Sequence, residues 1–244
     1  MVVLSRKYNT ILKSALEVVP NVYQLTIGGV NVILIAEEEL TLIDTGFRGI
    51  SAQIVDFIRS LGRSPEEISL IILTHNHLDH MGGLPGLKRF TSAKVAIHKA
   101  DISNTEAQLS HPRAKRKLLR ILPFFAFRSV ISLKAKEVDI QLEGGEVLKP
   151  LGGLRVIHTP GHTPGSISLF SPSNKLLIAG DALNKHGKTL RLPPKLASTD
   201  LAQALDSIKK MTQLDFDILC FGHGRPLTED VHIRIQDLIE RTKH

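Results

Sequence analysis

The stretch "SLIILTHNHLDHMGG" (69–83) joins a continuous apolar run to a cluster of polar side chains. The run "SLIIL" (69–73), flanked by turn residues, is typical of a strand that is buried on both faces. Three histidines and one aspartate follow it directly: His75, His77, Asp79 and His80. Imidazole nitrogens and carboxylate oxygens are natural ligands of zinc and its neighbours. The stretch therefore predicts a metal site in the loop after a buried strand.

The spacing within this loop suits two metal centres. Residues two apart on an extended segment, such as His75 and His77, can point to the same side. Asp79 and His80 begin a turn or helix, so their side chains diverge toward a second centre. Three further candidate ligands stand at predicted strand ends beside glycines, which let the backbone turn tightly near a site. They are His162 in "TPGHTPGS", Asp181 in "AGDAL" and His223 in "FGHGRP".

Strands and helices are predicted in a mixed order along the whole chain. Besides 69–73, strands are expected within 22–29, 30–39, 40–46, 93–99, 154–159 and 216–221, with a hairpin over 166–181 that turns at 172–174. Apolar residues at helical spacing predict a helix over 50–61, and Ser64-Pro65-Glu66-Glu67 has the pattern of a capping box. A helix is expected from about Asp200, and Thr228 is expected to cap a final one.

The composition is that of an ordinary globular protein. The chain has 244 residues, of which 42% are hydrophobic and 23% charged, and we expect one domain over 1–244. The single cysteine, Cys220, allows no intrachain disulfide. Neither a secretion signal nor a run of about 20 apolar residues is found, so no membrane span and a cytoplasmic location are predicted. The net charge of +7 is spread along the chain, except at one place.

That place is the segment 104–136, which we expect to be a helical insertion or lid. It contains the basic run "RAKRKLLR" (113–120), followed by "ILPFFAF" (121–127). The aromatic side chains of Phe124, Phe125 and Phe127 are candidate substrate contacts, and the basic run could attract phosphate, RNA or a membrane surface. We favour the plainer interpretation, a covering helix with a solvated basic face.

The other histidines carry weaker signals. His98 and His158 lie in predicted strands, and we expect them to be packed. His186 follows Asp181 in a loop and is a candidate substrate contact. Exposed positions are expected for His111, His232 and His244.

The seven candidate ligands, preceded by Asp44-Thr45-Gly46, resemble the full motif series of the metallo-β-lactamase superfamily, in the family's order, from about residue 20 to 227. The resemblance implies an α/β fold, a four-layer αββα sandwich of two mixed sheets with the site at one edge. It also implies that His75, His77 and His162 hold one metal, that Asp79, His80 and His223 hold the other, and that Asp181 bridges them. Catalytic roles fall to Asp79 and to Asp44, which would orient the histidine loop.

The resemblance further implies the chemistry. Two divalent ions, zinc first and iron or manganese as alternatives, would lower the pKa of a bridging water, and the resulting hydroxide would attack an ester, thioester or lactone carbonyl. True β-lactamases lack a bridging aspartate such as Asp181, and classical glyoxalase II carries a long helical C-terminal domain, so lactonase-like and glyoxalase II-like hydrolases of similar length are the better match. A small molecule is the expected substrate. Phosphodiester or RNA cleavage and iron-dependent redox chemistry of the persulfide dioxygenase type remain alternatives, and nucleic acid is the less favoured partner. The oligomeric state is left open.

Overall fold

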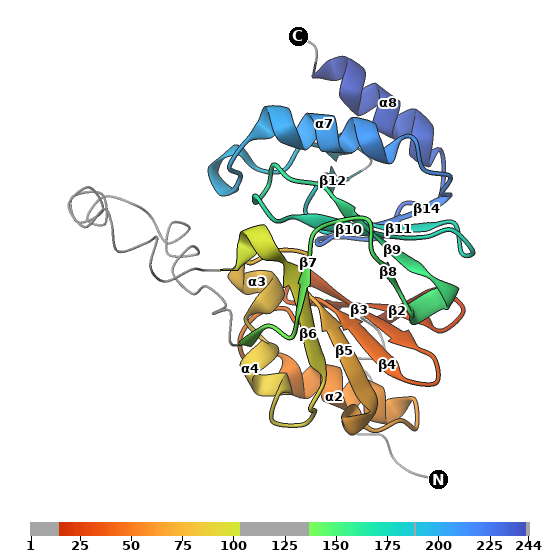
Figure 1. Cartoon of the computed structure of the whole chain (residues 1–244). Helices are drawn as coiled ribbons and strands as arrows, with labels where there is room; N and C mark the ends of the chain where they lie inside the picture. Colours follow the sequence, from red (N-terminus) through yellow and green to blue (C-terminus); the bar gives the residue numbers. More distant parts are fainter. Residues whose placement is uncertain (1–14, 103–136, 188, 243–244) are drawn as a thin grey trace, which may run out of the picture.

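The computed structural model describes residues 15–102, 137–187 and 189–242. The predicted insertion at 104–136, with Phe124, Phe125 and Phe127, lies outside the described residues. Within the described part, two sheets lie face to face and helices cover their outer faces (Figure 1). This is the predicted αββα arrangement.

The first sheet contains seven strands in the order of the sequence. They are β1 (Ala15–Val19), β2 (Val22–Ile27), β3 (Val30–Ala36), β4 (Leu40–Ile43), β5 (Ile68–Ile72), β6 (Lys94–His98) and β7 (Ile140–Leu142). Strands β1 to β4 pair antiparallel, whereas β4 to β7 pair parallel. Parallel strands end at the same edge of a sheet. The loops that follow β4, β5 and β6 are therefore neighbours.

The second sheet has the order β14-β11-β10-β9-β8. Its strands are β8 (Val147–Leu148), β9 (Leu154–His158), β10 (Ile167–Ser171), β11 (Leu176–Ile178) and β14 (Ile218–Cys220). Because β11 and β14 pair parallel, the segments that follow them, which carry Asp181 and His223, leave the sheet at one edge. A separate hairpin consists of β12 (Asn184–His186) and β13 (Thr189–Arg191).

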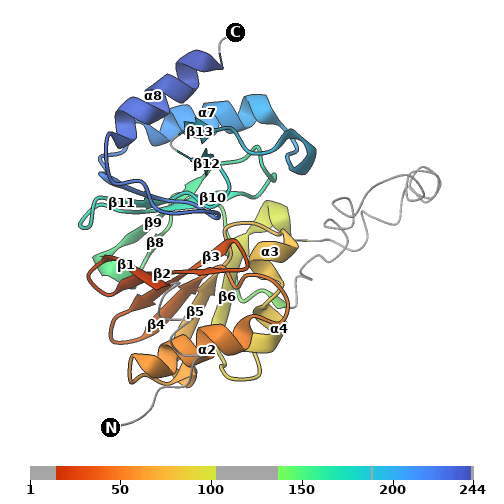
Figure 2. The ribbon, with the colours of Figure 1, turned by 180° about the vertical axis from the view of Figure 1, so that it is seen from behind.

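The helices lie on the two outer faces (Figures 1 and 2). On the side of the first sheet are α2 (Ser51–Ser60), α3 (Leu78–Met81) and α4 (Leu84–Leu87), and on the side of the second are α7 (Leu201–Met211) and α8 (Val231–Arg241). Short 3-10 turns occur at η1 (Pro65–Glu67), η2 (Lys99–Asp101), η5 (Pro150–Gly152) and η6 (Lys195–Ala197). None of the helices in the described ranges has the length and apolar content that crossing a membrane requires.

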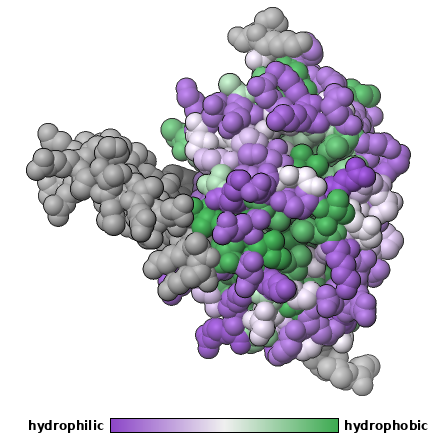
Figure 3. Space-filling view, viewed as in Figure 1, coloured by the Kyte–Doolittle hydropathy of each residue, from purple (hydrophilic) through white to green (hydrophobic). Residues whose placement is uncertain are grey.

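Three apolar clusters fill the spaces between these layers. On β5, the side chain of Ile71 belongs to the cluster beneath α2, whereas that of Ile72 belongs to the cluster between the sheets. A strand that contributes to two clusters needs apolar residues on both faces, which explains the continuous run in the sequence. The space-filling view shows apolar side chains in a band between the two halves of the molecule (Figure 3). The start of β5 is less covered than predicted, since Ser69 and Leu70 are only half-buried.

The predicted capping box at Ser64 is present at the start of η1. The predicted cap at Thr228 is wrong, because α8 begins only at Val231, after Asp230 in a left-handed conformation. Leu227 forms a β-bridge with Leu219, which keeps the chain extended up to the position of Thr228.

Candidate metal centre

The seven predicted ligands come from five segments that meet at one edge of the sandwich. His75 and His77 follow β5, Asp79 and His80 lie in α3, and the others come from the second half of the chain. Nitrogen and oxygen atoms of these side chains form three groups in which all atoms lie within 4.8 Å of one another. The groups are His75–His77–His162, His75–His80–Asp181 and Asp79–His80–His223.

Asp181 stands between the other ligands. Its Oδ2 lies 3.5 Å from His162 Nε2 and 3.4 Å from His223 Nε2, and its Oδ1 lies 3.6 Å from His80 Nε2. Asp79 Oδ2 lies 3.5 Å from His223 Nε2. These distances are long for hydrogen bonds, and one carboxylate contacts imidazoles from both halves of the molecule. The arrangement can accommodate a pair of cations on either side of Asp181.

Several of these atoms are buried without a hydrogen-bond partner among the described residues. They include His75 Nε2, His80 Nε2 and Asp181 Oδ1. Buried polar atoms are rarely left so, and clusters of them indicate a missing ion or water. His223 differs from the others, because 34% of its side chain is exposed, whereas His75, His80 and His162 are at most 1% exposed. The cluster therefore opens to solvent beside His223.

The second ring nitrogen of four histidines is engaged on the side away from the cluster. His80 Nδ1 lies 2.7 Å from Asp44 Oδ2, and His223 Nδ1 donates to the Gly29 carbonyl oxygen at 2.9 Å. Thr74 Oγ1 lies 3.0 Å from His75 Nδ1, and Ser198 Oγ lies 3.1 Å from His162 Nδ1.

The donors and acceptors of these contacts fix the tautomers. The Thr74 hydroxyl donates a hydrogen bond to the Asp44 carboxylate, and the Ser198 hydroxyl donates one to the Pro194 carbonyl oxygen. Each hydroxyl can therefore only accept from the neighbouring imidazole. A protonated Nδ1 leaves the lone pair on Nε2, the atom that faces the cluster, as in histidines that bind metals.

Asp44 contacts the histidine loop from beneath. It follows β4 with a φ of 62°, a left-handed conformation that only glycine, asparagine and aspartate adopt readily. Its Oδ1 accepts from the backbone N–H of Thr74 at 2.8 Å, while its Oδ2 contacts His80. The carboxylate thus links the residue before His75 to His80.

The charges in the cluster shift several pKa values. Burial would raise the pKa of Asp181, but the neighbouring His80 and His223 imidazoles outweigh burial and hold it well below its usual range. Burial opposes protonation of His223, yet the nearby Asp181 and Asp79 carboxylates raise its pKa to about 10. The pKa of His75 is lowered by burial and by the nearby His80 and His162. A cation that binds here must therefore displace protons.

Close backbone approach is required at one glycine of the site. A Cβ on Gly222 would lie 2.0 Å from Asp181 Oδ1 and 2.6 Å from His80 Cε1. Any larger residue at this position would occupy the space of the ligands. This is the tight approach that the glycines beside the candidate ligands predicted.

Two further residues, which sequence analysis missed, hold the ligand loops. Asn31 on β3 donates its side-chain amide to the carbonyl oxygens of Phe221 and Gly224, on either side of His223. Asp101, 1% exposed, accepts hydrogen bonds from Asn76 and Thr163, which adjoin ligands. A polar residue within the apolar strand "VNVILIA" was a usable signal for Asn31, whereas nothing in "IHKAD" marks Asp101.

The remaining candidates lie apart from the cluster or outside the described residues. His186 is exposed on β12, and no contact found among the described residues joins it to a ligand. His98 and His158 stack on each other with ring centroids 3.9 Å apart. Cys220 is fully buried, and burial raises the pKa of its thiol to about 12, so its thiol is not poised to act as a nucleophile.

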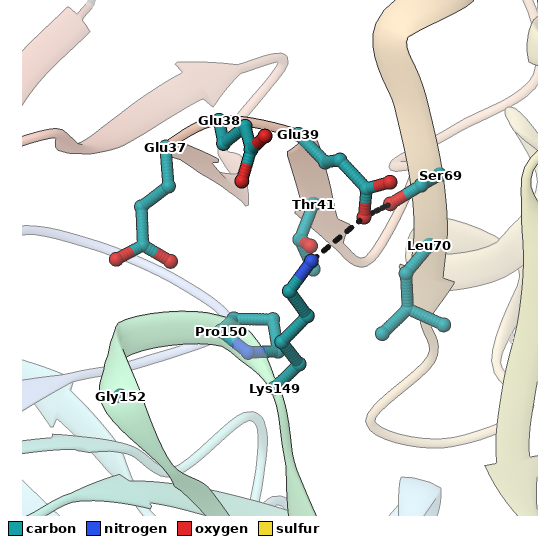
Figure 4. A pocket seen from close by; sticks show the side chains of 9 residues that line it. All are labelled: Glu37, Glu38, Glu39, Thr41, Ser69, Leu70, Lys149, Pro150 and Gly152. Carbon is teal, nitrogen blue, oxygen red and sulfur yellow. Dashed lines mark hydrogen bonds and ion pairs between the residues drawn. The ribbon is translucent and has the colours of Figure 1, made fainter.

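A second cavity, of about 350 Å³, lies where β4 and β5 begin, at the edge opposite the ligand cluster. Glu37, Glu38, Glu39 and Lys149 line it together with the backbone of η5 (Figure 4). Glu39 contacts Lys149 at 3.8 Å and Ser69 at 3.0 Å. Among the described residues, no predicted site residue lines this cavity.

Comparison with known proteins agrees with this geometry. The family described as "Metallo-beta-lactamase superfamily" matches residues 25–223. A probable metallo-hydrolase, YflN of Bacillus subtilis, is 29% identical over 232 residues, 87% of each chain. An N-acyl homoserine lactonase of a Bacillus species is 29% identical over 178 residues, 70% of this chain and 62% of its own. The fold resembles that of the metallo-beta-lactamase family protein TTHA1429 from Thermus thermophilus, with a TM-score of 0.71 and 24% identity over 93% of this chain and 81% of that one.

Proposed function

Because this chain belongs to the metallo-beta-lactamase superfamily, we propose that it is a two-metal hydrolase that cleaves esters, thioesters or lactones. The observation that carries the proposal is the position of Asp181, whose two carboxylate oxygens face imidazoles of both candidate metal groups. His75, His77 and His162 would hold one ion, and Asp79, His80 and His223 the other. The similarity to an N-acyl homoserine lactonase supports the lactone as one substrate class.

Two divalent ions, with zinc as the first candidate, would supply Lewis acidity and a hydroxide at neutral pH. The chain's own residues prepare this chemistry. The contacts of the four Nδ1 atoms fix the rings, so that each Nε2 already faces the cluster before anything binds. Asp181 is ionised at neutral pH, because its neighbours hold its pKa low.

The substrate would approach from the side of His223, the most exposed of the four supported histidines. On this side lies the turn between β2 and β3, which contributes the carbonyl oxygen of Gly29 to His223. Phe47 adjoins the same turn, with its ring 3.8 Å from a Cβ built on Gly28, and is 41% exposed. An exposed aromatic ring beside the opening suits a substrate with an apolar group next to its ester.

The proposal is tested on purified protein by metal quantification, followed by a substrate panel on the same sample. The panel contains a lactone, an aryl ester, a thioester, a β-lactam and bis(p-nitrophenyl) phosphate. We expect two divalent ions per chain and turnover of the carbonyl substrates that a strong chelator abolishes. Full turnover after demonstrated metal removal, faster cleavage of the phosphodiester, or one iron per chain would each contradict the proposal.

The role of Asp181 is tested with Asp181→Asn, which keeps the shape of the side chain and removes its charge. We expect kcat/KM to fall by roughly 100-fold, in the range seen when a group that orders a metal site is lost. Asp206→Asn on the exposed face of α7 is the matched control and should leave turnover unchanged. Near-normal activity of Asp181→Asn would refute the bridging role.

A further inference from the structure

Asp101 lies between two ligand loops that are far apart in sequence. It ends η2, directly after β6, and is 1% exposed. Its Oδ2 accepts from the backbone N–H of Asn76 at 3.0 Å and from Thr163 Oγ1 at 2.7 Å. Its Oδ1 accepts from the backbone N–H of Gly165 at 2.7 Å. One carboxylate thus fastens the loop after β5 to the loop after β9.

We propose that Asp101 is a positioning residue that sets the geometry of the His75–His77–His162 group and of no other part of the centre. The inference rests on the proposed metal-dependent function. Asn76 stands between His75 and His77, and Thr163 follows His162, so the carboxylate holds the backbone beside all three members of that group.

The other group has its own supports. His80 is held by Asp44, and the loop of His223 is held by Asn31 and by the Gly29 carbonyl oxygen. None of these contacts involves Asp101. Asp44 reaches both groups, through Thr74 and through His80, whereas Asp101 contacts only the loops of the first group, so loss of Asp101 should affect the two groups unequally.

The energetics of Asp101 agree with a positioning role. A buried carboxylate is unfavourable unless hydrogen bonds compensate for its lost hydration, and this carboxylate accepts its hydrogen bonds from the two ligand loops. The fit is tight, because a Cβ on Gly165 would lie 2.6 Å from Asp101 Cγ.

A second contact joins η2, which carries Asp101, to the loop after β9. His98 Nδ1 accepts from the backbone N–H of Ala100, which fixes η2 and with it Asp101. The His98 ring stacks on His158 at the end of β9, and His158 Nε2 donates to the carbonyl oxygen of Pro164 at 2.9 Å. The link through Asp101 is therefore rigid at both ends.

The test is a titration of metal-free protein with Co²⁺, followed by visible absorption and by competition with a chromophoric chelator. The Asp101→Asn substitution replaces one carboxylate oxygen, which accepts hydrogen bonds, with an amide N–H₂ group. This group then faces the same fixed donors from the two ligand loops. We expect one cobalt equivalent to bind roughly 10- to 100-fold more weakly, with altered d–d bands, and the other to bind as in the wild type. Thr163→Val, which removes a single donor to Asp101, should weaken the same equivalent by less.

The His223→Gln background identifies the affected centre, because it leaves the His75–His77–His162 group intact. In this background Asp101→Asn should weaken the ion that remains. The matched control is Asp139→Asn, since Asp139 also accepts a backbone N–H of β6, from Val95 at 2.8 Å, but its carboxylate bonds to neither ligand loop. This control should titrate as the wild type does.

Unchanged binding of both equivalents, or equal weakening of both, would overturn the proposal. If circular dichroism shows that Asp101→Asn does not fold, the cobalt titration of Thr163→Val distinguishes the same outcomes. The readout does not depend on turnover. A wild-type protein that binds cobalt but hydrolyses nothing would refute the proposed function and leave the result for Asp101 standing.

Discussion

The single residue Asp44 combines an unusual backbone with a defined electrostatic task. Its φ of 62° places its carboxylate beneath both Thr74 and His80. Asp44→Asn keeps a residue that tolerates this conformation and removes the charge that His80 faces. We expect metal affinity and kcat/KM to fall by roughly 10- to 100-fold, measured by metal analysis after dialysis and by steady-state kinetics. Asp217→Asn, an exposed carboxylate, serves as control. Unaltered metal content in Asp44→Asn would show that His80 needs no such partner.

The glycines of the His223 loop allow a matched comparison. Gly222→Ala would place a methyl group 2.0 Å from Asp181 Oδ1, whereas Gly224→Ala would meet nothing closer than 4.0 Å. Gly224 has a φ of 84°, so its variant carries backbone strain of about 1 kcal/mol. We therefore expect Gly222→Ala to lose metal and activity while Gly224→Ala retains both at slightly reduced thermal stability. Equal losses in the two variants would show that strain, rather than the clash, governs this loop.

Residue types and spacing predicted the ligands because metal binding restricts the chemistry of the side chain. The seven candidates converge as expected, and their metal-binding roles remain a prediction. Asp101 and Asn31 escaped prediction for a physical reason. Their partners are backbone groups about 25 and 190 residues away, and a backbone N–H or carbonyl leaves no trace in the sequence. The polar side chain of Asn31 within an apolar strand marked the residue but not its partners, and the loops that Asn31 and Asp101 hold are visible only in three dimensions.

At the scale of elements, the start of α7 is fastened to the loop of His162. Asp200 caps α7 by accepting from the backbone N–H of Gln203 at 3.0 Å, and its own N–H donates to the Gly161 carbonyl oxygen at 2.9 Å. A Cβ on Gly161 would lie 2.3 Å from Ala204 N. The helix and the ligand loop are therefore in direct contact.

Asp200→Ala removes the side-chain cap of α7 and keeps the hydrogen bond from the backbone N–H at position 200 to the Gly161 carbonyl oxygen. We expect the free energy of unfolding to fall by about 1 kcal/mol, measured by urea denaturation of the metal-free protein. Asp206→Ala lies in the same helix and carries only a surface ion pair with Lys209, so it should change stability by less than about 0.5 kcal/mol. A result in which the two variants are equal would remove the cap as the explanation.

Most elements could be predicted from local pattern, because burial imposes periods that the sequence records. The strands, the helix over 51–60 and the capping box at Ser64 are confirmed. Thr228 failed as a cap because a long-range bridge between Leu227 and Leu219 competes with helix initiation. On α7, Ala204 and Ser207 are buried while Leu201 and Leu205 are half-buried, since close packing on the ligand loop selects small residues there.

For the whole molecule, the family, the αββα fold and the class of metal-dependent hydrolases are confirmed as the sequence predicted them. The substrate is a different matter. The metal ligands define the centre, whereas selectivity for the substrate depends on the protein surface around the centre. Phe47, exposed beside the turn that supports His223, is one described candidate for such a contact, and the predicted contacts at Phe124, Phe125 and Phe127 fall outside the described residues.

The candidate centre also joins the two halves of the sandwich. His75, His77, Asp79 and His80 follow the first sheet, whereas His162, Asp181 and His223 belong to the second. Ions held by both halves bind the folded chain and not the unfolded one. Each would stabilise the fold by about 2.7 kcal/mol at a free concentration 100 times its Kd.

We therefore expect the midpoint of thermal unfolding to fall by roughly 10–20 °C after chelation of both ions and to recover when metal is returned. Without metal, His223 has a pKa of about 10 and is protonated at neutral pH, so binding must release protons and weaken as the pH falls. The gain in midpoint should accordingly be larger at pH 8 than at pH 6, measured by differential scanning calorimetry with metal-free and metal-loaded samples. In Asp181→Asn, metal should raise the midpoint by less than in the wild type at both pH values. A midpoint that does not respond to demonstrated loss of metal would mean that the ions, if bound, do not connect the two halves.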